Sequence, residues 1–154
     1  GELELAGCHV YRLDPTSGAL RQMTDDFVMP NGLAFSPDES LLYIVDTGST
    51  HLPDGPNHMR RVSVARDGTL SGGEVFARDP MKFFDGFRVD RAGRLWCGAG
   101  DGVDCYHPDG TLIGKIAVPE RVGNLTFGGP KLQDLLICAT TSIFRIGVNA
   151  TGSS

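Results

Sequence analysis

A short turn sequence occurs three times along this 154-residue chain, and the repetition constrains its fold more than any other feature. The copies read DPTSGAL at residues 14–20, RDGTL at 66–70 and PDGTL at 108–112. Their glycines, Gly18, Gly68 and Gly110, are 50 and 42 residues apart. Aspartate and glycine between two apolar runs are typical of a tight turn that joins neighbouring β-strands. The spacing predicts a protein built from repeated β-hairpin units.

A second repeated phrase falls between the turn sequences. NGLAF at residues 31–35 matches DGFRV at 85–89 and, less closely, NLTF at 124–127. An apolar run follows each copy after about ten residues, as in LLYIV, and this composition is typical of a strand buried on both faces.

Short β-type runs cover the chain, and no long window has the period of about 3.6 residues that marks an amphipathic helix. The expected strands are residues 9–13, 32–35, 41–45, 61–65, 74–77, 86–89, 95–97, 103–106, 112–118, 125–127, 135–139 and 143–148. A unit of about 40–50 residues with four short strands is the blade of a β-propeller. We therefore predict an all-β fold, with one partial β-propeller domain over residues 1–154. It would hold the end of one blade, two further blades and most of another, about three blades in all.

Composition excludes several classes of partner. The formal charge of −5 comes from 19 acidic and 14 basic residues without a basic stripe, which argues against nucleic acid and anionic membranes as partners. No apolar run approaches the roughly 20 residues of a membrane-spanning helix. The four cysteines lack C-x-x-C spacing, and Cys97 and Cys138 lie in apolar runs where we expect them to be buried. A disulfide framework is not expected, and the chain is predicted to be cytoplasmic.

Polar residues open the innermost strand of each predicted blade. Asn31, Asp85 and Asn124 hold equivalent positions in the repeats, so their side chains are expected to converge at one mouth of the central channel. Carboxylate and amide oxygens without thiolates suit a hard cation such as Ca²⁺, Mg²⁺ or Mn²⁺, and Zn²⁺ also accepts oxygen ligands. The alternative is that Asn and Asp before Gly are turn residues that hydrogen-bond their own backbone.

Three stretches resemble the gluconolactonase, regucalcin (senescence marker protein) and luciferin-regenerating enzyme family. They are MPNGLAFSPD with LYIVDT at residues 29–38 and 42–47, FDGFRVD with GRLW at 84–90 and 93–96, and VGNLTFGG at 122–129. The resemblance extends from about residue 7 to residue 148 and implies the C-terminal half of a six-bladed propeller with one divalent cation in its channel.

The resemblance implies that Asn31 and Asp85 are metal ligands. It also implies a glutamate ligand that neither Glu2 nor Glu4 matches, so the third ligand is expected upstream of this chain. The implied cation is Ca²⁺ in the first place, with Zn²⁺, Mg²⁺ or Mn²⁺ as alternatives.

The activity implied by the resemblance is hydrolysis of a sugar lactone or similar cyclic ester. The cation would polarise the lactone carbonyl and lower the pKa of a bound water. Asp85 is expected to act also as the catalytic general base, and no substrate-binding residue is assigned. The alternative function is a non-catalytic propeller that binds a small ligand or a protein partner.

Other polar residues are weaker candidates. Asp46 ends an apolar strand and is either a neighbour of the metal ligands or a strand-end turn residue, while His51 and His58 lie in a Pro/Gly-rich loop and either contact substrate or are inert. No G-x-S-x-G sequence supports serine-hydrolase chemistry. We expect the isolated chain to bind metal weakly and to self-associate, or to recruit a partner chain, through open blade edges.

Overall fold

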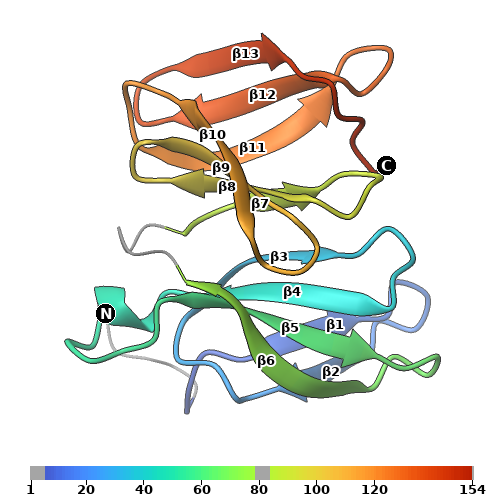
Figure 1. The fold of residues 1–154 in the computed structure, drawn as a ribbon. Coiled ribbons are helices and arrows are strands. Elements are labelled where there is room, and N and C mark those ends of the chain that lie inside the picture. Colours follow the sequence, from blue (N-terminus) through green and yellow to red (C-terminus); the bar gives the residue numbers. More distant parts are fainter. Residues whose placement is uncertain (1–5, 79–83, 154) are drawn as a thin grey trace.

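The computed structural model describes residues 6–78 and 84–153, which form four antiparallel sheets (Figure 1). The first sheet pairs β1 (Val10–Leu13) with β2 (Leu20–Thr24). The second contains β3 (Pro30–Phe35), β4 (Leu41–Asp46), β5 (His58–Val64) and β6 (Leu70–Arg78), with the short 3-10 helix η1 (Gly48–Thr50) after β4. The third contains β7 (Phe87–Val89), β8 (Leu95–Ala99), β9 (Gly102–Tyr106) and β10 (Leu112–Ala117). The fourth contains β11 (Val122–Gly128), β12 (Asp134–Ala139) and β13 (Ile143–Gly147).

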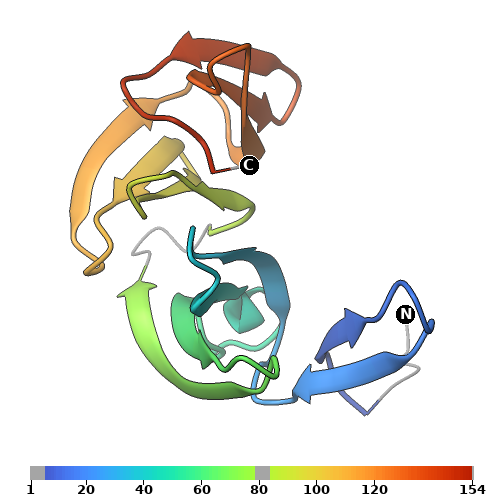
Figure 2. The same cartoon turned by 90° about the vertical axis from the view of Figure 1, so that its right-hand side faces the viewer.

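The sheets follow one another in chain order around an arc (Figure 2). Strand β7 contacts both β3 and β11, so the first strands of three successive sheets lie together on the inner side. This arrangement confirms the predicted all-β fold of about three propeller blades. No helix of the described residues has the length and apolarity needed to cross a membrane.

The repeated turns join equivalent strand pairs, namely β1 to β2, β5 to β6 and β9 to β10. In each turn an aspartate carboxylate accepts the backbone N–H of a threonine, at 2.8 Å for Asp14, 2.9 Å for Asp67 and 2.8 Å for Asp109. The glycines have φ of 71°, 82° and 94° for Gly18, Gly68 and Gly110, a region that favours glycine. The turn chemistry read from the sequence is therefore confirmed.

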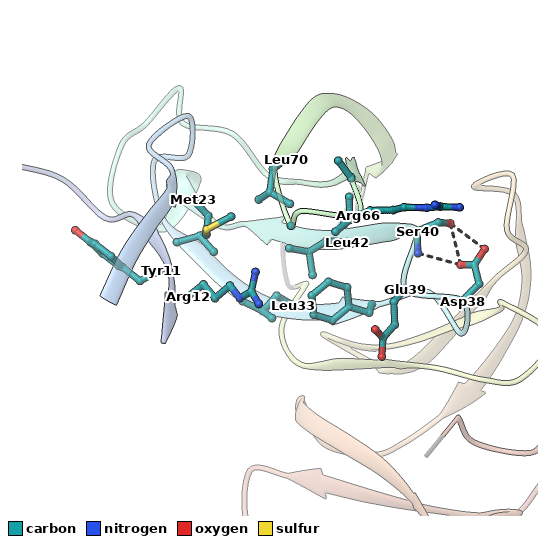
Figure 3. Close-up of a pocket in the computed structure, with 15 residues that line it drawn as sticks. Tyr11, Arg12, Met23, Leu33, Asp38, Glu39, Ser40, Leu42, Arg66 and Leu70 are labelled. Atoms are coloured by element: carbon teal, nitrogen blue, oxygen red, sulfur yellow. Dashed lines mark hydrogen bonds between the residues drawn. The ribbon is translucent and has the colours of Figure 1, made fainter. Parts of the chain in front are cut away.

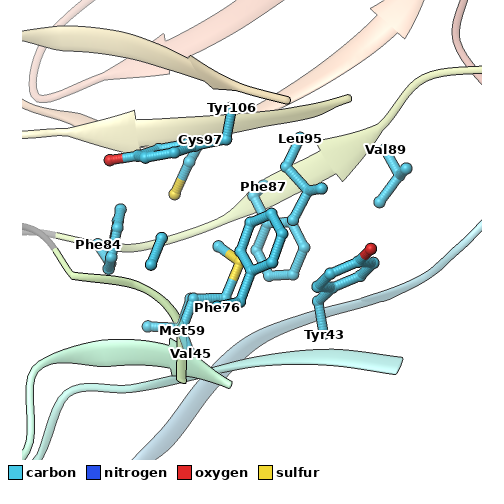
Figure 4. Packing of buried hydrophobic residues seen from close by; sticks show 11 residues of the cluster. Tyr43, Val45, Met59, Phe76, Phe84, Phe87, Val89, Leu95, Cys97 and Tyr106 are labelled. Atoms are coloured by element: carbon cyan, nitrogen blue, oxygen red, sulfur yellow. The ribbon is translucent and has the colours of Figure 1, made fainter. Parts of the chain in front are cut away.

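Apolar side chains fill the space between neighbouring sheets. The cluster between the second and third sheets, shown in Figure 4, consists of Tyr43, Val45, Met59, Phe76, Ala77, Phe84, Phe87, Val89, Leu95, Cys97 and Tyr106. A second cluster joins the third and fourth sheets and includes Val103, Leu125 and Leu135, with Trp96 packed edge-on against Phe127 at 6.0 Å. Burial of both faces explains why β4 and β8 are almost wholly apolar.

Two expectations from the sequence were wrong or incomplete. Strand β2 was not predicted, because its residues are mostly exposed and carry no apolar pattern. Cys138 is exposed although Cys97 is buried, since no described sheet packs on its face of the fourth sheet. No disulfide joins the four cysteines, all of which lie within the described residues.

A groove of about 600 Å³ lies between the first and second sheets (Figure 3). Tyr11, Met23, Leu33, Leu42 and Leu70 line it, and the Leu33 side chain is 48% exposed. In both four-stranded sheets an inner strand pair precedes the pair joined by the repeated turn, whereas the first sheet contains only β1 and β2 among the described residues. The groove separates this strand pair from β3 and β4, and most of the side chains that line it are apolar.

Candidate metal centre

Asn31 and Asp85 come from neighbouring sheets, and their side chains meet. Asn31 lies in β3, Asp85 lies two residues before β7, and the Asn31 Nδ2 donates a hydrogen bond to the Asp85 Oδ1 at 3.3 Å. The two residues are 54 positions apart in the chain. The structure therefore brings together the two residues that the sequence repeat placed at equivalent positions.

The local backbone of β3 presents Asn31 at the mouth. The pairing of β3 with β4 shifts register between Pro30 and Leu33, so a β-bulge falls on Asn31 and Gly32. Bulges occur next to functional sites because the extra residue re-aims a side chain. Asn31 is exposed as a result.

Asp46 fixes the segment that leads into Asn31. Its buried carboxylate accepts backbone N–H groups from Val28 at 2.9 Å, from Met29 at 2.9 Å and from Gly48 at 3.1 Å. Asp46 thus ties the approach to β3 and the start of η1 to the end of β4. Of the two roles considered for Asp46, the contacts support the strand-end residue that organises its surroundings.

Asp85 is anchored by the core on either side. Phe84 is 1% exposed and Phe87 is fully buried in the cluster between the second and third sheets. The backbone N–H of Asp85 donates to the Gly98 carbonyl at 3.3 Å, and that of Gly86 donates to the Gly123 carbonyl at 2.9 Å. This anchoring holds the half-buried carboxylate beside Asn31.

The glycines that follow Asn31 and Asp85 permit close approach between blades. A Cβ on Gly32 would lie 2.6 Å from the Asp85 carbonyl oxygen, and one on Gly86 would lie 2.3 Å from the Asn124 Oδ1. Real Cβ contacts are essentially never that short. The glycine in each of these two repeats is therefore required by the residue that the next blade brings against it.

Asn124 differs from its two counterparts. Its Oδ1 accepts the backbone N–H of Leu125 at 2.9 Å and lies 3.4 Å from the Nη1 of Arg88, which can also donate to it. The oxygen is thus engaged within the third and fourth sheets. The expected convergence of three side chains is reduced to the pair of Asn31 and Asp85, and no group of three His, Cys, Asp or Glu side chains within residues 6–78 and 84–153 could hold a metal ion.

The pair fits the chemistry of a hard cation. Oxygen ligands of Ca²⁺ lie about 2.3–2.6 Å from the ion, so two adjacent ligand oxygens are about 3.3–3.7 Å apart when they subtend a right angle. The Asn31 amide and the Asp85 Oδ1 are 3.3 Å apart. A flip of the terminal amide of Asn31 exchanges Nδ2 for Oδ1 and would offer two oxygens at the spacing that a shared ion needs.

Two hollows open beside this pair. One, of about 270 Å³, is lined by Met29, Pro30, Asn31, Thr47, Thr50, His51, Phe84 and Arg121. The other, of about 430 Å³, is lined by Arg121, Gly123, Asn124, Cys138, Ala139 and Thr140. Arg121 is common to both hollows, and neither Arg121 nor Thr50 was predicted because no motif marks them.

The two loop histidines have different surroundings. His51 lines the first hollow, whereas His58 pairs with Asp46 in the β4–β5 ladder. Burial lowers the pKa of His58, the charge of Asp46 raises it, and the charges of Arg78 and Arg60 lower it further. His51 is therefore the histidine that remains a candidate for contact with a ligand.

The sequence of this chain is similar to those of a known family and of a known enzyme. The family model described as the SMP-30/Gluconolactonase/LRE-like region matches residues 4–141. Lactonohydrolase oryH of Aspergillus oryzae is 34% identical in an alignment that covers 93% of this chain and 34% of that protein.

Two solved structures share the fold at appreciable sequence identity. A gluconolactonase from Xanthomonas campestris superposes with a TM-score of 0.83 at 37% identity, over 96% of this chain and 46% of its own. Regucalcin from Agrobacterium tumefaciens, described as a calcium-binding protein, gives a TM-score of 0.78 at 28% identity, over 94% of this chain and 53% of its own. The chain thus spans between 34% and 53% of the length of these relatives. The match over residues 4–141 shows that the chain belongs to the SMP-30/gluconolactonase/LRE-like family.

Proposed function

We propose that the protein hydrolyses a sugar lactone with one divalent cation held by Asn31 and Asp85. The observation that carries the proposal is the contact of 3.3 Å between their side chains across two blades. Membership of a family whose relatives include a lactonohydrolase and a gluconolactonase supports lactone hydrolysis as the reaction.

The two oxygens of Asp85 have different neighbours. Oδ1 faces Asn31, while Oδ2 faces Gly123 on the next blade, 3.9 Å from where a Cβ on that glycine would lie. One oxygen can therefore serve as a ligand while the other accepts a proton from the attacking water. A bound divalent cation supplies Lewis acidity, which polarises the lactone carbonyl and lowers the pKa of bound water.

The donor set favours Ca²⁺ as the cation. Carboxylate and amide oxygens are hard ligands, and among the described residues the one cysteine that lines either hollow is Cys138, in the hollow away from Asn31. The calcium-binding description of the regucalcin neighbour supports the same choice. Mg²⁺, Mn²⁺ and Zn²⁺ are the alternatives, because oxygen ligands also serve them.

Uncovered blade faces support self-association of the chain. The groove beside β1 is lined mostly by apolar residues, and Ile143 in the edge strand β13 has 77% of its surface exposed. Unpaired strand edges with apolar residues are templates for pairing with another chain. A second copy, or a partner chain with a complementary strand, would cover them.

Lactone hydrolysis releases a carboxylic acid, so pH-stat titration with D-glucono-1,5-lactone tests the proposal directly. We expect base uptake above the spontaneous rate, loss of the excess rate on chelation and recovery on addition of Ca²⁺. Activity that survives both chelation and Asp85→Ala would refute this mechanism. Cation binding without turnover would instead support a non-catalytic binding propeller.

A further inference from the structure

We infer that the hollow beside Asn31 is the substrate pocket and that His51 accepts a hydrogen bond there from a hydroxyl group of the lactone. The inference rests on the proposed function and deepens it, because it requires a polyhydroxylated rather than a plain cyclic ester. Its ground is a chain of hydrogen bonds in the η1 segment that fixes which nitrogen of His51 carries the proton.

The loop that carries His51 is held at both ends. The Thr47 N–H donates to the Met29 carbonyl at 3.0 Å, and the Ser49 N–H donates to the Pro56 carbonyl at 2.9 Å. The His51 N–H donates to the Gly48 carbonyl at 3.1 Å. The exposed His51 thus lies on a loop whose backbone is hydrogen-bonded to Met29, two residues before Asn31.

Thr50 determines the tautomer of His51. The Thr50 Oγ1 lies 2.8 Å from the Thr47 carbonyl oxygen, which can only accept, so the single hydroxyl proton is donated there. The same Oγ1 lies 2.8 Å from the His51 Nδ1. With its proton committed, the hydroxyl can only accept from the ring, so Nδ1 carries the hydrogen. In the neutral ring Nε2 then has a lone pair and acts as an acceptor.

The pocket suits one sugar-sized molecule. Its volume of about 270 Å³ lies just below the range of about 300–1,000 Å³ for small-molecule sites, which favours a monosaccharide over a polymer. Asn31 lines the same pocket, so a lactone whose carbonyl lies at the Asn31–Asp85 pair would place its ring hydroxyls toward the η1 segment. Met29 and Pro30 supply apolar surface for the ring carbons.

The test compares two non-hydrolysable lactams that differ in their hydroxyl groups. Isothermal titration of D-glucono-1,5-lactam and of δ-valerolactam measures binding without turnover. We expect His51→Phe to weaken the hydroxylated lactam about tenfold, as for one lost hydrogen bond, and to leave δ-valerolactam unchanged. His51→Gln, which keeps an acceptor, restores part of the affinity. His107→Phe is the matched control, because His107 is an exposed histidine in the outer β9–β10 turn.

Nitrogen NMR of the His51 ring gives a readout independent of activity. We expect the neutral ring to be protonated at Nδ1, and Thr50→Val to shift the population toward protonation at Nε2. Protonation at Nε2 in the unsubstituted protein would overturn the inference. So would a His51→Phe variant that binds D-glucono-1,5-lactam as tightly as the wild type does. Lactam binding that depends on His51 in a protein without lactonase activity would uphold this inference and refute only the proposed function.

Discussion

The side-chain amide of Asn124 packs against the backbone of Gly86, which directly precedes β7, the first strand of the neighbouring blade. A Cβ at Gly86 would lie 2.3 Å from Oδ1 and 2.4 Å from Cγ of Asn124. Likewise, a Cβ at Gly32 would lie 2.6 Å from the Asp85 carbonyl oxygen. Each glycine thus allows two successive blades to approach closely at the mouth, and the contact of Gly32 lies between the same two blades that bring Asn31 and Asp85 together.

Gly86→Ala is expected to displace the Asn124 side chain and to lower the free energy of unfolding by about 1–3 kcal/mol, as for other overpacked sites. Urea denaturation measures the change. Gly147→Ala is the control, because a Cβ at Gly147 meets nothing within 4 Å. Combining Gly86→Ala with Asn124→Ala should recover part of the loss, and a double variant less stable than the sum of the single variants would contradict the contact.

Asp46→Asn should destabilise the protein and loosen the approach to Asn31. The amide keeps one acceptor oxygen, whereas the carboxylate accepts three backbone N–H groups. Loss of hydrogen bonds to a charged acceptor predicts a decrease of about 1–3 kcal/mol in the free energy of unfolding. Asp54→Asn, in the exposed segment between η1 and β5, serves as the control for chemical denaturation. Equal free energies of unfolding of the two variants would show that the Asp46 carboxylate does not stabilise this segment.

His58 should make stability depend on pH. Burial lowers its pKa, and its Nδ1 is buried without a hydrogen-bond partner among the described residues. The unfolded state therefore binds the proton more readily, so this contribution to stability is present above the ordinary histidine pKa of about 6.5 and is lost as the pH falls below it. We expect the free energy of unfolding to fall more steeply for the wild type than for His58→Gln between about pH 7.5 and about pH 5.5. His51→Gln is the control, because His51 is exposed. The same dependence of the free energy of unfolding on pH in the wild type and in His58→Gln would contradict this role of His58.

Self-association of the 154-residue chain is expected to depend on its open strand edge. Sedimentation velocity should show species larger than the monomer, and Ile143→Lys should shift the distribution toward the monomer because a charge on an edge strand opposes pairing. Asp54→Lys adds the same side chain to an exposed loop and should leave the distribution unchanged. A wild-type chain that is monomeric at every concentration would refute the prediction.

Much of the fold was predictable because the repeated turns depend on interactions between residues that are close in the sequence. The aspartates and glycines of the repeated turns act on their own backbone, so their role could be read without knowledge of distant residues. The meeting of Asn31 and Asp85 could also be predicted, because equivalent positions in successive blades lie side by side. Strand β2 has no comparable signal, since its residues are mostly exposed.

The rest of the site depends on contacts that no single segment encodes. Asn124 has the same place in the repeat as Asn31, yet its Oδ1 is engaged by Leu125 and Arg88. Arg121 and Thr50 line the hollow beside Asn31 although both are distant from it in the sequence. Likewise, the exposure of Cys138 follows from what covers its sheet rather than from its apolar neighbours.

Calorimetric titration with Ca²⁺ tests the shared cation site most directly. Asn31→Ala and Asp85→Ala should each weaken binding at least about tenfold, with little further loss in the double variant, because both side chains act on one ion. Asn124→Ala is the matched control, since it alters the equivalent position in the next blade, whose oxygen is already engaged, and it should bind as the wild type does. Undiminished affinity in Asp85→Ala, or equal losses in Asn31→Ala and Asn124→Ala, would contradict the account.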